Sequence, residues 1–306
     1  VAADYDRDGD PDLFVGGRHT PQQYPAPGNS FLLENREGFF VDVTEEKAPG
    51  LQKAGMVTTA LWTDIDDDGW PDLMIAGEWM APLVFRNLDG KLQKQAIAEL
   101  DRQSGWWNIL LGVDLDQDGD TDYIGGNLGL NSRYRADSLQ PLQLFVNDFN
   151  RDRRVDGILA YRQDGRLFPM HPRDDVLRQL NFLKRKFTSY QSFAEADMVQ
   201  IFTPELLERS ALLESRQMQS CYLENLGNFR FRVHPLPPEA QVAPVSGILS
   251  GDFNEDSYPD LLLNGNDFAS EVIQGPHDAF NGLLLLGDGK GGFRPQASRH
   301  TGFWVT

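Results

Sequence analysis

The sequence predicts an all-β protein, a β-propeller of four-stranded blades with a helical insertion. Three observations lead to this prediction: an acidic loop recurs along the chain, short apolar runs flank each loop, and an Asn/Gly hairpin pattern follows most of the loops. Each unit therefore contains a strand, an acidic loop, a second strand and a hairpin, which makes four strands. About five such units are represented in the 306 residues.

The acidic loops keep one spacing of oxygen-bearing side chains. They read DYDRDGDPD, DIDDDGWPD, DLDQDGDTD, DFNRDRRVD and DFNEDSYPD, at residues 4–12, 64–72, 114–122, 148–156 and 252–260. Asp or Asn stands at positions 1, 3, 5 and 9 of every loop. A spacing kept five times argues against a disordered acidic linker. Like charges this close together also need a partner of opposite sign.

The runs around the loops predict strands. NILLGV precedes Asp114, for example, and LMIAG begins at Leu73, each apolar and bounded by Gly, Asp or Asn. Strand, Asn/Gly turn, strand patterns then follow, and Gly and Asn tolerate the positive φ of tight hairpins. These patterns cover residues 31–40, 83–92, 221–231 and 283–293.

The spacing of the later units predicts an insertion. No hairpin pattern separates the third loop from the fourth, so the third unit is expected to be atypical or incomplete. The fourth and fifth loops start 104 residues apart, which is too long for one blade. We expect a helical insertion over residues 172–213, within the fourth blade and between its second and third strands. Thr203 is the expected N-cap before Pro204, and apolar residues recur at helical spacing at Val176, Leu180, Leu183 and Phe187.

The chain is expected to be a single domain over residues 1–306, with both ends cut within a repeat. It opens on the apolar lead-in VAAD and closes on the apolar run GFWVT. The absence of a signal peptide from this stretch therefore says nothing about a longer parent protein.

The loop chemistry predicts calcium. Short carboxylates at alternate positions can converge on one point, and hard oxygen ligands with one backbone carbonyl make the shell that Ca²⁺ prefers. Zinc would require His or Cys, which every loop lacks. Glycine at position 6 of the first three loops lets the backbone reverse so that position 7 can offer its carbonyl. The open alternative is an acidic turn that binds no ion. This alternative is stronger for the last two loops than for the first three.

The loop and the hairpin together resemble a known repeat. D-x-D-x-D-G-x-x-D between two strands, followed by N-x-x-G-x-F, resembles the FG-GAP/VCBS repeats of integrin-α-like β-propellers. GGNLGLNSRY, VNDFNRD, LENLGNFRF and GLLLLGDGKGGF more particularly resemble bacterial VCBS proteins of the ASPIC/UnbV group. Propellers of this family usually have seven blades, so the resemblance implies blades beyond those represented here.

The resemblance also implies the ligands, position by position. In the first three loops the side chains would come from Asp4, Asp6, Asp8, Asp12, Asp64, Asp66, Asp68, Asp72, Asp114, Asp116, Asp118 and Asp122. The backbone carbonyls would come from Asp10, Trp70 and Asp120. Three Ca²⁺ sites are expected, and up to five if the last two loops also bind.

The fourth and fifth loops depart from the motif. Asn replaces the second Asp in both, and Arg153 and Ser257 replace the glycine. We expect the fourth loop to bind most weakly, or to form an Arg–Asp pair in place of a metal site, because three arginines lie in it. The corresponding positions are Asp148, Asn150, Asp152, Arg154, Asp156, Asp252, Asn254, Asp256, Tyr258 and Asp260.

Composition excludes several classes of partner. The formal net charge of −18 argues against binding to a nucleic-acid backbone. No window approaches the length of an apolar membrane span. The single cysteine, Cys221, excludes an intrachain disulfide framework and is expected to be a small buried residue in a strand.

No catalytic motif is present, so we expect a protein that is not an enzyme. The five histidines lack ligand-like spacing and are expected at the surface or in loops. The six tryptophans offer a possible sugar-stacking platform, although packing between blades is the favoured interpretation; at least one of Trp106 and Trp107 should be core. The basic run Lys184–Lys186 is expected on a solvated helix face, with recognition of an acidic partner as the alternative.

The function expected from the sequence is a calcium-stabilised scaffold for cell adhesion or other binding. It would bind a protein or glycan ligand outside the cell, at the cell surface or in the periplasm, where calcium is millimolar. The alternative is a carbohydrate-active hydrolase or lyase with its site on one propeller face. The oligomeric state and the identity of the ligand stay open.

Overall fold

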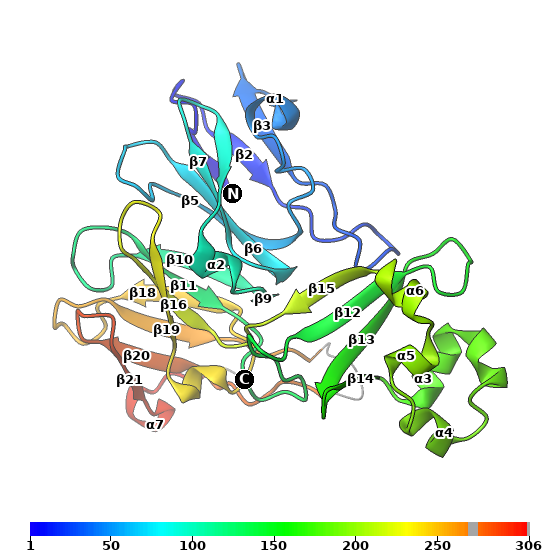
Figure 1. The fold of residues 1–306 in the computed structure, drawn as a ribbon. Helices are drawn as coiled ribbons and strands as arrows, with labels where there is room; N and C mark the ends of the chain where they lie inside the picture. Colours follow the sequence, from blue (N-terminus) through cyan, green and yellow to red (C-terminus); the bar gives the residue numbers. More distant parts are fainter. Residues whose placement is uncertain (269–274, 305–306) are drawn as a thin grey trace.

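The computed structural model describes residues 1–268 and 275–304 (Figure 1). The last two residues of the C-terminal apolar run, 305–306, lie outside the described residues. Antiparallel strands account for most of the regular structure, and the helices are short. The predicted all-β class is confirmed.

Four antiparallel sheets have their strands in simple spatial order, each strand beside the next. The first sheet contains β1 (Ala2–Ala3), β2 (Asp12–Val15), β3 (Phe31–Arg36) and β4 (Phe39–Asp42). The second contains β5 (Met56–Thr63), β6 (Asp72–Met80), β7 (Leu83–Asn87) and β8 (Leu92–Gln95), with β9 (Gly105–Trp106) beside β6. The third contains β10 (Ile109–Val113), β11 (Asp122–Gly126), β16 (Cys221–Asn225) and β17 (Phe231–Pro235). The last contains β18 (Gly247–Gly251), β19 (Asp260–Asn264), β20 (Leu283–Gly287) and β21 (Phe293–Gln296).

A fifth sheet, the inserted sheet, lies in the chain between β11 and β16. It contains β12 (Leu142–Asn147), β13 (Asp156–Gln163), β14 (Arg166–Pro169) and β15 (Ala211–Ser215), in the spatial order β14-β13-β12-β15. The third sheet is therefore complete, and the hairpin at 221–231 belongs to it instead of to the fourth unit. The expectation of an incomplete third unit is therefore wrong, because apolar runs and turn residues identify strands but not the strands that they pair with.

The helical segment lies between the third and fourth strands of the inserted sheet in chain order. The predicted position between the second and third strands is wrong, because β14 pairs with β13 before the helices begin. Residues 211–213 are already part of β15. The segment contains α3 (Arg173–Gln179), η1 (Asn181–Arg185), α4 (Tyr190–Ala194), α5 (Met198–Ile201) and α6 (Pro204–Glu208).

The local signals for this segment are confirmed. The Thr203 side chain accepts a hydrogen bond from the amide of Leu206, and Pro204 begins α6. The four apolar residues at helical spacing are all buried in one cluster against the inserted sheet, as Val176, Leu180, Leu183 and Phe187. The remaining short helices are α1 (Thr44–Lys47), α2 (Ala98–Asp101), η2 (Pro238–Gln241) and α7 (Ser298–Thr301).

The four simple sheets pack face to face in chain order. Strand β6 shows how: Leu73 and Ile75 are buried in a cluster with residues of the first sheet, whereas Met74 and Ala76 are buried in a cluster with the third. Alternate residues of one strand point to opposite faces, so a strand buried on both faces is apolar throughout. A further cluster joins the third sheet to the last. In Figure 1 these sheets follow one another from blue through cyan, then green and yellow, to orange and red, with the inserted sheet and its helices to one side.

Each acidic loop joins two neighbouring antiparallel strands, as predicted. The pairs are β1 and β2, β5 and β6, β10 and β11, β12 and β13, and β18 and β19. The loops of successive sheets touch: the Arg7 guanidinium lies 4.3 Å above the Trp70 ring, and Gln117 donates to the carbonyl of Ser257 at 2.9 Å. In the described part of the chain no helix has the length and apolar character needed to span a membrane.

Candidate metal centre

All five acidic loops follow the same backbone path. Position 4 has a left-handed backbone in every loop, with φ between 57° and 63° at Arg7, Asp67, Gln117, Arg151 and Glu255. Position 6 is also left-handed, with glycine in three loops and with Arg153 (φ 69°) and Ser257 (φ 72°) in the other two. The predicted reversal at position 6 therefore occurs with and without glycine.

Hydrogen bonds from the loop backbone hold the carboxylates in place. The amide at position 6 donates to the aspartate at position 1 in every loop, for example from Gly69 to Asp64 at 2.7 Å. The amide at position 7 donates to the side chain at position 5, for example from Trp70 to Asp68 at 2.9 Å. The alternate acidic side chains consequently turn toward the inside of the loop.

The aspartate at position 9 is a buried brace. Asp72 is fully buried, and its two oxygens accept from the amides of Ile65 at 3.1 Å and Asn87 at 2.6 Å. It thus ties the start of its loop to the hairpin of the same sheet. The same two-sided brace is formed by Asp12, Asp122 and Asp260. In the inserted sheet Asp156 accepts from Phe149, and the side chain of Gln179 on α3 takes the place of the hairpin amide.

The hairpin asparagines join neighbouring sheets, a role that the sequence analysis missed. The side-chain amide of Asn87 donates to the carbonyl of Tyr5, in the acidic loop of the preceding sheet, at 2.7 Å. Asn225 donates to the carbonyl of Ile65 in the same way at 3.1 Å. Both asparagines are buried, and each also accepts a turn amide. The sequence signal for this role is the repeated Asn of the hairpin pattern. Turn geometry alone is sufficient to explain an Asn at that position, so the contact between sheets could not be inferred from it.

Three loops bring three carboxylates close enough to share one metal ion. The groups are Asp4, Asp6 and Asp8, then Asp64, Asp66 and Asp72, then Asp114, Asp116 and Asp122, with the ligand oxygens of each group within 4.8 Å of one another. Loops four and five form no such group among the described residues, because asparagine replaces the second carboxylate. The first three predicted loops are thus distinguished from the last two.

Each of these three loops holds a buried carboxylate oxygen that no protein group pairs with, which is the fit expected for a hard cation. One oxygen of each of Asp4, Asp66 and Asp120 is buried without a hydrogen-bond partner. Burial raises the pKa of Asp72 to about 7, and burial followed by repulsion from Asp118 raises the pKa of Asp120 to about 7. Removal from water without an opposite charge disfavours the ionised carboxylate, so the donor set suits a bound divalent ion.

A charged residue immediately before each hairpin asparagine makes the three sites unequal. Arg86 lies beside the second loop and pairs with Asp66 at 2.6 Å and with Asp68 at 3.1 Å. The equivalent residues are Glu34 beside the first loop and Glu224 beside the third, and each is paired with basic residues on its own hairpin. The second site is therefore partly neutralised by the protein.

The left-handed serine in the fifth loop yields a stability prediction. Ser257→Gly should raise the free energy of unfolding by about 0.5 to 1 kcal/mol, because a side chain at this φ is strained and glycine is not. Urea unfolding in the presence of EGTA measures the change. Gly119→Ala is the matched control: nothing lies within 4 Å of the added Cβ, so its φ of 101° alone should lower stability. A loss of stability in Ser257→Gly would contradict the argument.

Other residues singled out by the sequence fall into clear groups. Cys221 is buried at the start of β16, where burial raises the pKa of its thiol to about 12. Trp107 is fully buried, which confirms the expectation of one core residue in the Trp pair, whereas Trp304 is 63% exposed. Lys184 and its two basic neighbours are exposed, as expected for a solvated face. His277 lies in a loop, as expected of a histidine at the surface or in loops, although its side chain is buried.

The comparisons with known proteins agree with this repeated geometry. The family model for the FG-GAP-like repeat matches residues 4–75 and 64–125, which contain the first three acidic loops. A search of curated proteins found no match. The two repeat matches and the antiparallel four-stranded sheets together fit an FG-GAP β-propeller.

Proposed function

We propose that this chain is a calcium-stabilised β-propeller that serves as a binding scaffold outside the cell. The observation that carries the proposal is the set of three carboxylate groups, each built by the same loop on a successive sheet. The first group would use the side chains of Asp4, Asp6 and Asp8, with the carbonyl of Asp10 and the carboxylate of Asp12 completing the shell. Calcium, with its preference for six to eight oxygen ligands, suits such a shell better than magnesium does.

Charge supports the same ion. Three bound Ca²⁺ would bring the formal net charge from −18 to −12, and five would bring it to −8. Repetition of the site in successive sheets favours a structural role over a catalytic one, because a catalytic pair of carboxylates is needed once. We assign the last two loops a weaker affinity, since each forms a loop of the same shape with one carboxylate fewer.

The wider setting is part of the proposal. Sites of modest affinity suit compartments with millimolar calcium, such as the extracellular space, the cell surface or the periplasm. The four sheets in chain order would be blades of a propeller that has seven in the complete protein, related to the ASPIC/UnbV group. A protein or a glycan would be the ligand, and the propeller would bind it without turnover. No observation on the described residues favours the alternative of a carbohydrate-active hydrolase or lyase.

Thermal unfolding tests the proposal. With a few millimolar Ca²⁺ the unfolding midpoint should rise by about 10 °C or more relative to EGTA, because a site loaded about thirtyfold above its Kd adds roughly 2 kcal/mol and three such sites act together. Mg²⁺ at the same concentration is the control and should have a much smaller effect. An unchanged midpoint in calcium would refute the proposal.

A further inference from the structure

A pocket of 430 Å³ lies at the strand ends opposite to the acidic loops. Asn108 precedes β10 and Leu128 follows β11, whereas the third acidic loop joins the other ends of these two strands. Ser246, which precedes β18, is placed in the same way. The pocket volume falls within the range of about 300 to 1,000 Å³ typical of small-ligand sites. Its lining combines the aromatic residues Trp106 and Tyr134 with charged and neutral polar side chains.

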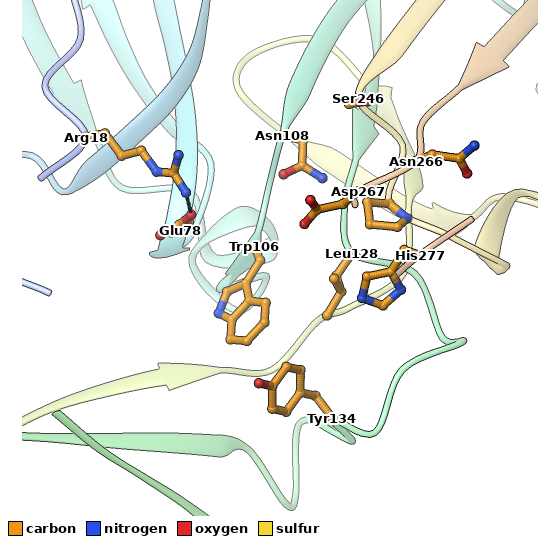
Figure 2. A pocket seen from close by; sticks show the side chains of 11 residues that line it. Arg18, Glu78, Trp106, Asn108, Leu128, Tyr134, Ser246, Asn266, Asp267 and His277 are labelled. Atoms are coloured by element: carbon orange, nitrogen blue, oxygen red, sulfur yellow. Dashed lines mark hydrogen bonds and ion pairs between the residues drawn. The ribbon is translucent and has the colours of Figure 1, made fainter. Parts of the chain in front are cut away.

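The aromatic part of this pocket is held rigidly. Figure 2 shows Trp106 and Tyr134 side by side, below the Arg18–Glu78 pair. Trp106 contacts Trp79 and Tyr134 edge to face, with ring centroids 5.1 and 5.0 Å apart. The buried amide of Asn127 accepts a hydrogen bond from the Trp106 backbone at 3.1 Å. Since these contacts fix the ring, Trp106 offers a preformed apolar surface.

The polar part of the pocket is mixed in character and nearly balanced in charge. Asn108, Asn266 and Ser246 supply neutral donors and acceptors. Arg18 and Glu78 form an ion pair with each other. Across the pocket, Asp267 and His277 are held together by two backbone hydrogen bonds of 2.9 and 2.8 Å. This lining therefore has no excess of basic groups for an anion.

The aromatic rings also do not form a cage for an organic cation. Such a cage needs ring faces turned toward one open centre, whereas Trp106 packs edge to face against both Trp79 and Tyr134. A fixed aromatic surface beside amides and a hydroxyl is instead suited to a ligand with an apolar face and many hydroxyl groups. Sugars have both features.

We propose that this pocket binds a neutral saccharide, with Trp106 as the apolar platform and Asn108 as a hydrogen-bonding partner of the sugar hydroxyls. This inference rests on the proposed function, because it assigns a ligand class and a location to the binding scaffold. The pocket is separate from the acidic loops, so the sugar site and the metal sites can be tested independently.

A glycan array that carries neutral and sialylated sugars tests the assignment, with the protein in millimolar Ca²⁺. We expect binding to neutral glycans, followed by titration calorimetry with the strongest of them. Asn108→Ala should weaken binding about tenfold through the loss of hydrogen bonds, and Trp106→Ala by about thirtyfold or more through the loss of the platform. Choline is the probe for the aromatic-cage alternative and should not bind.

Matched variants separate the pocket from general effects on folding. Asn181→Ala removes an amide from the exposed helical segment, and Trp304→Ala removes an exposed indole; neither should change binding. Asn108→Ala keeps the assignment testable if Trp106→Ala fails to fold. Absence of neutral-glycan binding, binding of sialylated glycans or choline alone, or full affinity in Asn108→Ala would overturn the assignment. If calcium still raises the unfolding midpoint in that case, the metal-stabilised scaffold stands without this sugar site.

Discussion

Asp72→Ala is expected to lower the free energy of unfolding by roughly 3 to 5 kcal/mol, even without calcium. The side chain is fully buried and accepts hydrogen bonds from two backbone amides, those of Ile65 and Asn87. Its removal leaves both donors without a partner in a buried region, at about 1 to 3 kcal/mol each. Urea unfolding in EGTA measures the effect without a contribution from bound metal.

Two variants sharpen this measurement. Asp72→Asn keeps one side-chain oxygen as a hydrogen-bond acceptor. It should therefore lower the free energy of unfolding less than Asp72→Ala does. Asp101→Ala removes an exposed carboxylate from the end of α2 and should change stability by no more than about 0.5 kcal/mol. If Asp72→Ala loses less than about 1 kcal/mol, the brace between loop and hairpin is not important for stability.

Asp116→Asn is expected to have opposite effects with and without calcium. Without metal, the pKa of Asp116 is raised by burial and by repulsion from Asp118, so neutralising it should stabilise the fold by up to about 1 kcal/mol. In calcium the same change removes a ligand, and the stabilisation of roughly 2 kcal/mol from that site should be largely lost. The variant should thus unfold at a higher urea concentration than the parent protein in EGTA, and at a lower urea concentration in calcium.

Asp66→Asn in the second loop is the matched comparison. Asp66 is paired with Arg86 at 2.6 Å, whose side-chain Nε is buried without a hydrogen-bond partner. Burial raises the pKa of Asp66 as well, but its neutralisation costs Arg86 the shorter of its two ion pairs. Asp66→Asn should therefore stabilise the metal-free protein less than Asp116→Asn does, or should destabilise it. If both variants respond alike in EGTA, the distinction between the two loops is wrong.

The sequence was sufficient for the features that depend on local pattern. The acidic loop, its flanking strands and the N-cap at Thr203 are all encoded within a few residues, and all are present. The same holds for the buried helical face that contains Val176 and Leu180. In each case, a short-range rule such as strand alternation or helix capping determines the outcome.

Strand partners over long distances could not be predicted in the same way. Tyr123 pairs with Leu223 across the whole inserted sheet, and nothing in either run identifies the other. The inserted sheet also departs from simple strand order, since β15 returns beside β12. Such non-local pairings depend on packing of the complete chain, which single-strand patterns do not contain.

The candidate site was likewise predicted only in part. Spacing identified the carboxylates, but it could not show that Asn87 and Asn225 tie each loop to the preceding sheet. Nor could it show that Arg86 reaches the second loop, since the arginine is fourteen or more positions from each acidic residue. These contacts arise because the hairpin of each sheet folds back over its acidic loop.

Anomalous diffraction from crystals grown in millimolar calcium tests the central claim most directly. We expect anomalous peaks inside the loops at residues 4–12, 64–72 and 114–122, each within bonding distance of the aspartate oxygens. Empty loops under these conditions, with the carboxylates turned toward solvent, would contradict a scaffold stabilised by calcium.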